Sequence, residues 1–397
     1  MNILFMYPKM FHPHKGGIER VTDLLCREFI NRGHNVFYLN NVCDESLTNY
    51  SYPASVFFFP YSTDNINANG DYFVEFLLTH KIDIVVNQDP MLYHGLFYHT
   101  VHLESVHVIS VVHNTPLWGY AFFTKFTLQL RNKTLVEKVK RIARVFKLPL
   151  IKRGYLRELE LCYRESLIYT DLLCLLSLKF IPELKQIYKG DLSKVIAIAN
   201  PNTYPSIQSE LFTSKKKQLL YVGRIEWYQK RADRLVYIWK QLYKKFPDWE
   251  LIVVGDGPIK QTLELRFSSI PRVSFVGYQE PRKFYQDASI LCLTSDFEGW
   301  GMVLTEAMTF GTVPVLFDSF AAVTDIVDDG KTGLLVPPFS LKKYIRKLSG
   351  IMSDDCLRME MSQASIQSVK KFDIKQVVDK WEDVFQLLKS VKNDFTL

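Results

Sequence analysis

Two segments in the second half of the chain have residue types and spacings suited to binding an anion. The first runs from Ser295 to Met308, SDFEGWGMVLTEAM, and places Gly299 and Gly301 between an apolar run and a helix-like pattern. Glycines at a strand-to-helix turn let the backbone approach a ligand, and the start of a helix offers N–H groups and a positive dipole end. This pattern predicts a phosphate or diphosphate site.

Two carboxylates belong to the same segment. Glu298 precedes the expected helix, and Glu306 follows eight residues later. At this separation they cannot act as a pair on one atom, so we expect them to reach different parts of one extended ligand. A lone glutamate is usually an ordinary solvated residue. The neighbouring glycine turn is what favours a binding role for both.

The second segment, VGRIEWYQK, runs from Val222 to Lys230 and also follows an apolar run. Arg224 and Lys230 could converge on the same phosphates, because arginine grips two oxygens at once and lysine acts as a point charge. Two basic residues after a strand are usually just solvated. Open α/β sheets, however, bind ligands at the carboxyl ends of their strands, which favours a binding role here.

Short apolar runs separated by helical patterns must position these segments. Most of the runs are continuously apolar, as expected for parallel strands covered on both faces, so the predicted fold class is α/β with open sheets. The expected strands are 3–7, 35–39, 56–59, 82–87, 107–112, 172–176 and 195–199, then 219–222, 251–254, 273–276, 290–293, 313–317 and 334–336.

The two series of strands indicate two domains. The segment NPNTYP at 200–205 contains two prolines and several turn formers, and it is the best linker candidate. We therefore predict one domain at 1–200, a second at 201–372, and a closing helix at 373–397 that crosses back to the first domain.

Composition excludes several classes of protein. The chain has 397 residues, 47% of them hydrophobic and 23% charged, which is ordinary for folded domains and unlike a disordered chain. No apolar run is long enough to span a bilayer, and we interpret the first residues as a strand and not as a signal peptide. The six cysteines form no Cys-x-x-Cys pair, so we expect reduced, buried thiols in a cytoplasmic protein.

A basic stretch at 122–157 stands apart from this pattern. It contains eleven Lys or Arg between Lys125 and Arg157, only one acid, Glu137, and many interleaved apolar residues. Such helices lie on anionic membrane surfaces, which is our hypothesis. The alternative is a solvated basic helix packed on its own domain. We expect no nucleic acid partner, since no nucleic-acid-binding motif accompanies the stretch.

Taken together, these segments resemble the signature of family 4 of the retaining glycosyltransferases. The resemblance rests on Glu298 and Glu306 with EGWG between them, on Val222–Lys230, on the glycine loop that contains Gly16 and Gly17, and on the motifs at 254–258, 273–277 and 311–314. It implies the GT-B fold, in which two Rossmann-like domains face a central cleft. The first domain would then bind the acceptor and the second the nucleotide sugar.

The resemblance also implies roles for individual residues. Arg224 and Lys230 would neutralise the donor diphosphate, Glu306 would bind the ribose, Glu298 would touch the donor sugar, and His113 would face that sugar. A lone histidine after a strand is more often a structural residue, and only the position of His113 favours a role at the site. The further donor-binding residues would be Gly16, Gly17, Gly223, Val276, Gly277, Tyr278, Gly299, Trp300, Gly301, Met302 and Val303.

The expected function is transfer of a sugar, with retention, from a UDP- or GDP-linked donor to an acceptor hydroxyl. The acceptor would be a lipid-linked or polysaccharide intermediate of cell-surface glycan synthesis, made at the inner face of the plasma membrane. We expect no cofactor and no metal, because no compact carboxylate cluster is evident. One alternative is a non-catalytic, membrane-associated binding protein with the same fold. A dinucleotide-dependent oxidoreductase is disfavoured, because HPHKGG at 12–17 lacks the Gly-x-Gly-x-x-Gly turn.

Overall fold

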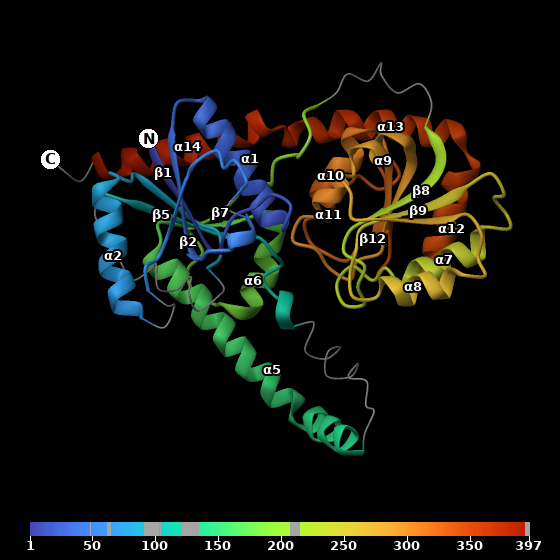
Figure 1. Cartoon of the computed structure of the whole chain (residues 1–397), viewed down its shortest axis with the longest axis horizontal. Coiled ribbons are helices and arrows are strands. Elements are labelled where there is room, and N and C mark those ends of the chain that lie inside the picture. The colour runs from blue at the N-terminus through green and yellow to red at the C-terminus, as the bar shows by residue number, and fades with distance from the viewer. Residues whose placement is uncertain are drawn as a thin grey trace. The chain divides into compact units, whose positions relative to one another are not determined.

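The computed structural model describes residues 1–47, 49–61, 65–90, 103, 105–120, 135–206 and 215–393. The chain divides into two compact units, drawn in Figure 1. Unit 1 consists of Met1–Pro201 and Ile374–Leu397, and unit 2 of Asn202–Asp373. Each unit contains its own parallel sheet with helices around it, which confirms the predicted α/β class.

In its described part, unit 1 has a seven-stranded parallel sheet in the order β3-β2-β1-β4-β5-β6-β7. The interior residues of β1 and all of β4 and β5 are buried, which explains why these strands are apolar throughout. The strands are β1 (Asn2–Lys9), β2 (Asn35–Val42), β3 (Ser55–Phe58), β4 (Ile84–Asn87), β5 (His107–Val112), β6 (Leu172–Leu175) and β7 (Val195–Ala197). The helices are α1 (Gly17–Asn31), α2 (Ile66–Thr79), α5 (Leu135–Tyr169), α6 (Ile181–Ile187) and α14 (Ile374–Asn393), with short 3-10 turns η1 (Glu45–Leu47) and η2 (Leu178–Phe180).

The last helix, α14, packs on α1 of unit 1. The Arg32 guanidinium lies 2.6 Å from Asp379 and 2.7 Å from Glu382, and His34 Nε2 lies 2.8 Å from the same Glu382. The rings of Phe29 and Phe385 meet with centroids 5.5 Å apart beside these charges. The chain therefore returns to unit 1 after it has completed unit 2.

In its described part, unit 2 has a six-stranded parallel sheet in the order β10-β9-β8-β11-β12-β13. The strands are β8 (Lys216–Val222), β9 (Glu250–Val254), β10 (Val273–Gly277), β11 (Ala288–Leu293), β12 (Val313–Phe317) and β13 (Leu334–Val336). The helices are α7 (Arg234–Leu242), α8 (Lys260–Phe267), α9 (Arg282–Asp287), α10 (Met302–Thr309), α11 (Val323–Ile326), α12 (Leu341–Ser353) and α13 (Asp355–Val369), followed by the 3-10 turn η4 (Lys370–Phe372).

The core of unit 2 consists of apolar side chains from its sheet and from the helices that cover the sheet. Trp239 and Trp249 are buried with strand residues such as Tyr221 and Ile290, and the indole N–H of Trp239 donates to Pro271 O at 3.0 Å. Burying one large apolar side chain contributes about 2–3 kcal/mol, so this cluster is a firm base for the strand ends.

Two expectations about the surface have different outcomes. Among the described helices none is both long and apolar enough to cross a bilayer. The expectation of buried thiols is wrong for Cys43 and Cys356, which are exposed; Cys26, Cys174 and Cys292 are buried. Cys43 and Cys356 do not belong to the buried strands of the two sheets: Cys43 follows β2, and Cys356 lies near the start of α13.

Candidate functional site

In unit 2, β9 and β10 follow on one side of β8, and β11, β12 and β13 follow on its other side. The switch point of this sheet therefore lies between β8 and β11. The two strands are neighbours, with Leu219 opposite Ile290 and Leu220 opposite Leu291. At such a switch point the loops that leave adjacent strands diverge and form a ligand site at the carboxyl ends. Loops 223–233 and 294–301 are therefore the candidate site.

Lys230 and Glu298 meet across these two loops. The Lys230 ammonium lies 2.7 Å from Oε1 and 2.9 Å from Oε2 of Glu298, whose side chain is only 5% exposed. The Ser295 hydroxyl also donates to Oε1, at 2.6 Å, and the Gln229 amide lies 3.5 Å from Oε2. Both carboxylate oxygens thus have partners, and an ammonium has three N–H donors, which leaves Lys230 capacity for an anion.

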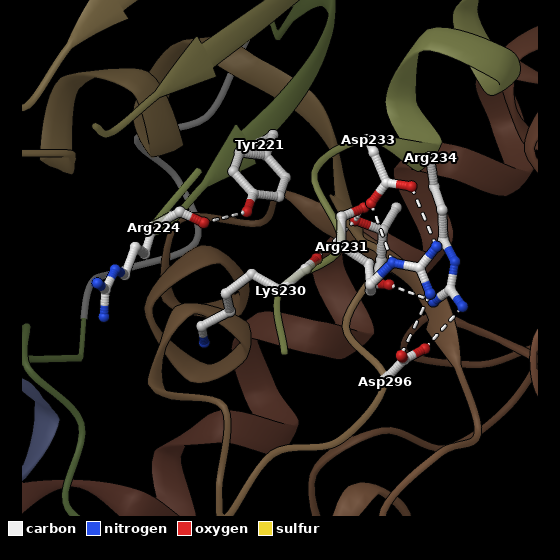
Figure 2. Close-up of polar contacts among 8 residues, drawn as sticks. Tyr221, Arg224, Lys230, Arg231, Asp233, Arg234 and Asp296 are labelled. Atoms are coloured by element: carbon white, nitrogen blue, oxygen red, sulfur yellow. Dashed lines mark hydrogen bonds and ion pairs between the residues drawn. The ribbon is translucent and has the colours of Figure 1, made fainter. Parts of the chain in front are cut away.

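Arg224 lies on the same loop in a different environment. Its side chain is 69% exposed, and its Nε lies 3.6 Å from Glu226 Oε2. Its backbone carbonyl accepts a hydrogen bond from the Tyr221 hydroxyl at 2.9 Å. Figure 2 shows that the side chains of Arg224 and Lys230 both extend toward the left of the view. The fold thus gives Lys230 a fixed partner and leaves most of Arg224 in solvent.

The glycine turn ends at the start of α10, as its sequence suggested. Gly301 has φ +79° and immediately precedes α10. Met302 and Val303, which begin the first turn of this helix, are half-buried. A Cβ on Gly301 would lie 3.2 Å from Leu304 Cδ1. Only glycine adopts this backbone without strain, and the first amides of a helix have no partner within it.

Gly299 and Trp300 are buried within this turn. The Trp300 side chain is 3% exposed, and its ring meets the Phe372 ring edge-on, with centroids 5.1 Å apart. Its indole nitrogen has no hydrogen-bond partner. Any ligand contact from Trp300 would therefore come from its backbone, since the ring is packed inside unit 2.

Glu306 is held by two hydroxyl groups. One carboxylate oxygen accepts from Thr203 Oγ1 at 2.6 Å and the other accepts from the Tyr285 hydroxyl at 2.8 Å, and the residue is 1% exposed. Glu298 and Glu306 thus have separate partners. Hydroxyl groups are therefore the donors that this carboxylate binds.

The neighbouring loops of unit 2 pack backbone against backbone. A Cβ on Gly255 would lie 2.0 Å from Gly223 O, and one on Gly257 would lie 2.4 Å from Ile225 O. At the end of β10, Gly277 has φ +77° and its carbonyl accepts from Gly255 N at 2.8 Å. These glycines allow the loops after β8, β9 and β10 to touch. Val276 and Gly277 are half-buried, and Tyr278 is exposed.

The remaining candidates lie in unit 1. Gly16 precedes α1 with an extended backbone, and a Cβ there would lie 2.5 Å from Glu19 Oε2; Gly17 is the first residue of the helix and has open space. His113 follows β5, and its Nε2 donates to Gln88 Oε1. Burial lowers the pKa of His113 to about 4, so its imidazole is neutral at pH 7.

The basic stretch is described in part. Residues 122–134 lie outside the described residues, and the rest belongs to α5, which contains Pro149. Figure 1 shows that the first half of α5 runs beyond the sheet of unit 1. Large apolar side chains are exposed there: Ile142 is 57%, Phe146 80% and Leu150 71% exposed.

Comparison with known proteins decides the family. Residues 205–368 match the sequence model of the family Glycosyl transferases group 1, which covers nearly all of unit 2. Residues 205–368 belong to the group 1 glycosyl transferases. An uncharacterized glycosyltransferase of Haemophilus influenzae is 30% identical over 201 residues, which cover 48% of this chain and 55% of the relative.

A second relative of the chain is an N-acetyl-D-galactosaminyltransferase of Campylobacter jejuni, named for a diNAcBac-PP-undecaprenol glycan. It is 27% identical over 213 residues, which cover 53% of this chain and 58% of that protein. The chain thus spans about half the length of the curated relatives it matches. The crystal structure of HepE from Anabaena with UDP covers 97% of this chain and 100% of its own, with TM-score 0.72 and 15% identity. This likeness confirms the GT-B fold.

Several residues at this site carried no clear sequence signal. Thr203 lies in the linker and Tyr285 within α9, yet both bind Glu306. Ser295 stands within the quoted segment, so its place beside Glu298 could have been suspected from its spacing. In the described part of the chain, no group of three or more His, Cys, Asp or Glu is arranged to hold a metal ion.

Proposed function

We propose that this chain transfers a sugar, with retention of configuration, from a UDP-linked donor to an acceptor hydroxyl without a bound metal. The observation that carries the proposal is the contact between half-buried Lys230 and buried Glu298 at the switch point, beside the start of α10, whose amides no side chain caps. The complex of HepE with UDP supports a uridine nucleotide as the first donor to test.

In this proposal the chain stabilises the negative charge that develops on the leaving diphosphate. Lys230, the exposed Arg224 and the amides of Met302 and Val303 would bind its oxygens. Groups that are already oriented toward developing charge need no reorganisation during the reaction, and each is worth about 3–4 kcal/mol in known oxyanion sites. Glu226 and Glu298 hold the two cations until the donor arrives.

The carboxylates would orient the rest of the donor. Glu306 already accepts from two hydroxyl groups, and the ribose hydroxyls are groups of the same kind. Glu298 would accept from a sugar hydroxyl while it keeps Lys230 in place. The loop of Val276, Gly277 and Tyr278 would lie along the base, and Gly223 would let the diphosphate approach the end of β8. Gly299 and Trp300 would contribute backbone groups.

The reaction balances without a protein nucleophile. The bond between the anomeric carbon and the diphosphate oxygen breaks, and a bond from that carbon to the acceptor oxygen forms on the same face. The acceptor proton passes to an oxygen of the leaving diphosphate. Unit 1 would bind the acceptor, while its Gly16 and Gly17 would contribute to donor binding and the neutral His113 would face the donor sugar.

The acceptor would be a lipid-linked or polysaccharide glycan of the cell surface, reached at an anionic membrane. The name of the Campylobacter jejuni relative supports a lipid-linked glycan. On α5, the exposed Phe146 and Leu150 stand among the basic residues Lys147 and Arg153, a combination that binds anionic lipid headgroups and the acyl boundary together.

Incubation with a panel of UDP- and GDP-sugars tests this function. We expect release of UDP and a glycosylated product with a polyprenyl-diphosphate glycan as acceptor, and the same rate after EDTA treatment. Binding of a nucleotide sugar without product from any acceptor would instead favour the non-catalytic alternative. Loss of activity with EDTA and recovery with Mg²⁺ would contradict metal independence.

A further inference from the structure

Arg234 is a buried charge at the first residue of α7. It is 7% exposed, and its guanidinium carbon lies 5.0 Å from the centroid of the Phe317 ring and 4.7 Å from that of Phe339. Burial lowers the pKa of this guanidinium. A charge in such surroundings persists only if it is paired, and a buried pair is often no more stabilising than apolar residues of the same size. We therefore expect a role of the charge on Arg234 other than stability.

The partners of Arg234 lie on the loop that carries Glu298. Its Nη1 donates to Thr294 O at 2.7 Å, and its Nη2 donates to Asp296 Oδ1 at 2.6 Å. Asp296 is 6% exposed and stands two residues before Glu298. Figure 2 shows Arg231 and Arg234 turned toward Asp296 from the other loop.

Hydrogen bonds to backbone carbonyls join the same two loops at Lys230 and at the residues on either side of it. Asp296 N donates to Gln229 O at 2.8 Å, and the Thr294 hydroxyl lies 3.0 Å from the carbonyls of both Lys230 and Arg231. Arg234 holds Thr294 and Asp296, and these residues hold the peptide groups that flank Lys230. The position of Lys230 relative to Glu298 thus depends on Arg234.

Arg231 is a second arginine that contacts Asp296. Its backbone is left-handed, with φ +49°, which is strained for a residue with a side chain. Its guanidinium bonds both oxygens of Asp233 at 3.0 Å and lies 3.3 Å from Asp296 Oδ2. These bonds stabilise the sharp turn between Lys230 and α7.

We propose that Arg234 and Asp296 form a clamp that positions Lys230 against Glu298 for binding of the diphosphate. Arg234 is a positioning residue in this proposal, since it acts on the ligand through Lys230. The inference rests on the proposed function, which places the diphosphate at Lys230. Lysine at 234 would keep the charge but could not bridge Thr294 and Asp296 with a planar fork.

The test is a double-mutant cycle in UDP affinity, measured by calorimetry on the whole chain. We expect Lys230→Ala to weaken UDP binding about 30-fold, as for loss of a charge-assisted hydrogen bond. Arg234→Lys should weaken it about tenfold. In the Lys230→Ala background, Arg234→Lys should have less than a twofold further effect, because the residue it positions is gone. Additive losses would overturn the clamp.

Stability is separated from positioning by two further variants. Arg234→Met with Asp296→Leu removes both charges and should unfold within a few degrees of the wild type, yet it should retain the weak UDP binding of Arg234→Lys. Wild-type UDP affinity in this variant would show that the pair is merely structural. Arg272→Lys is the control: Arg272, like Arg234, donates to a backbone carbonyl, Trp249 O, but it lies just before β10. It should leave UDP binding unchanged.

This cycle and the sugar-transfer assay fail independently. Wild-type protein that binds UDP but forms no product contradicts the proposed function and leaves the cycle to decide the clamp. Wild-type protein that transfers sugar but shows additive losses contradicts the clamp alone. Protein that binds neither UDP nor GDP overturns both.

Discussion

The ammonium of Lys230 contacts both carboxylate oxygens of Glu298, at 2.7 and 2.9 Å, although the two residues are 68 positions apart. They meet because β8 and β11, which precede them, are neighbours in the sheet of unit 2. The pair gives the buried carboxylate of Glu298 a partner, without which a buried charge would be costly. It also keeps the Lys230 ammonium beside the start of α10, where an anion would bind.

Removal of the Lys230 ammonium should reduce turnover strongly. We expect Lys230→Ala to lower kcat about 100- to 1,000-fold, because one oriented donor to the leaving diphosphate is lost. UDP release under saturating donor is the measurement. The control is Lys240→Ala, which removes an exposed lysine from α7 and should leave the rate unchanged. Equal rates in the Lys230 variant and the control would contradict the diphosphate role.

The Glu306 carboxylate should distinguish ribose from deoxyribose. If it accepts from a ribose hydroxyl, the wild type should bind UDP about tenfold more tightly than 2′-deoxy-UDP. Glu306→Ala should remove this preference, and Tyr285→Phe should keep it, since the Glu306 carboxylate remains when the Tyr285 hydroxyl is lost. Competition binding with both nucleotides measures the ratio. A preference that survives in Glu306→Ala would place the ribose elsewhere.

Alanine at Gly301 should weaken nucleotide binding as well as stability. The φ of +79° strains any side chain by about 1–2 kcal/mol, and the new Cβ would press on Leu304. The control is Gly330→Ala, with φ +81° and open space around it, which should cost similar stability without affecting UDP affinity. Thermal unfolding and UDP titration of both variants give the comparison, and equal UDP affinity in the two would argue against a ligand at this turn.

His113 should make the stability of the chain depend on pH. Its folded pKa is about 4, below the ordinary 6.5, so the unfolded chain binds more protons between these values. Stability is therefore fully present above pH 6.5 and is lost as the pH falls toward 4, by about 2 kcal/mol at pH 5. Urea unfolding at pH 7 and pH 5 measures this loss. His113→Gln should show a smaller loss, and an identical pH dependence in both proteins would contradict the buried neutral imidazole.

The α5 surface should bind anionic vesicles through both charge and apolar contact. Co-sedimentation with phosphatidylglycerol vesicles should exceed that with phosphatidylcholine, and it should weaken in high salt. Phe146→Ser with Leu150→Ser should reduce binding about tenfold or more, because two exposed apolar side chains no longer insert. Leu265→Ser removes a similarly exposed leucine from α8 and serves as the control. Equal binding to both lipids, or to neither, would leave α5 as a solvated basic helix.

The sequence by itself determined the strands, the fold class and the segments that hold the candidate site. Strands β1 to β13 lie at the predicted apolar runs, because a parallel strand covered on both faces must be apolar along its whole length. The glycine turn before α10 was likewise visible, since Gly301 and Gly311 have left-handed backbones that favour glycine.

Only the tertiary structure decided which side chains meet. Lys230 with Glu298, Arg234 with Asp296, and Thr203 with Glu306 are each joined across loops far apart in the chain. Such pairs follow from the order of strands in the sheet, which the apolar pattern of one strand does not encode. The sequence also did not show that Arg224 is exposed and Glu306 is buried, because exposure depends on which neighbouring loops cover a residue.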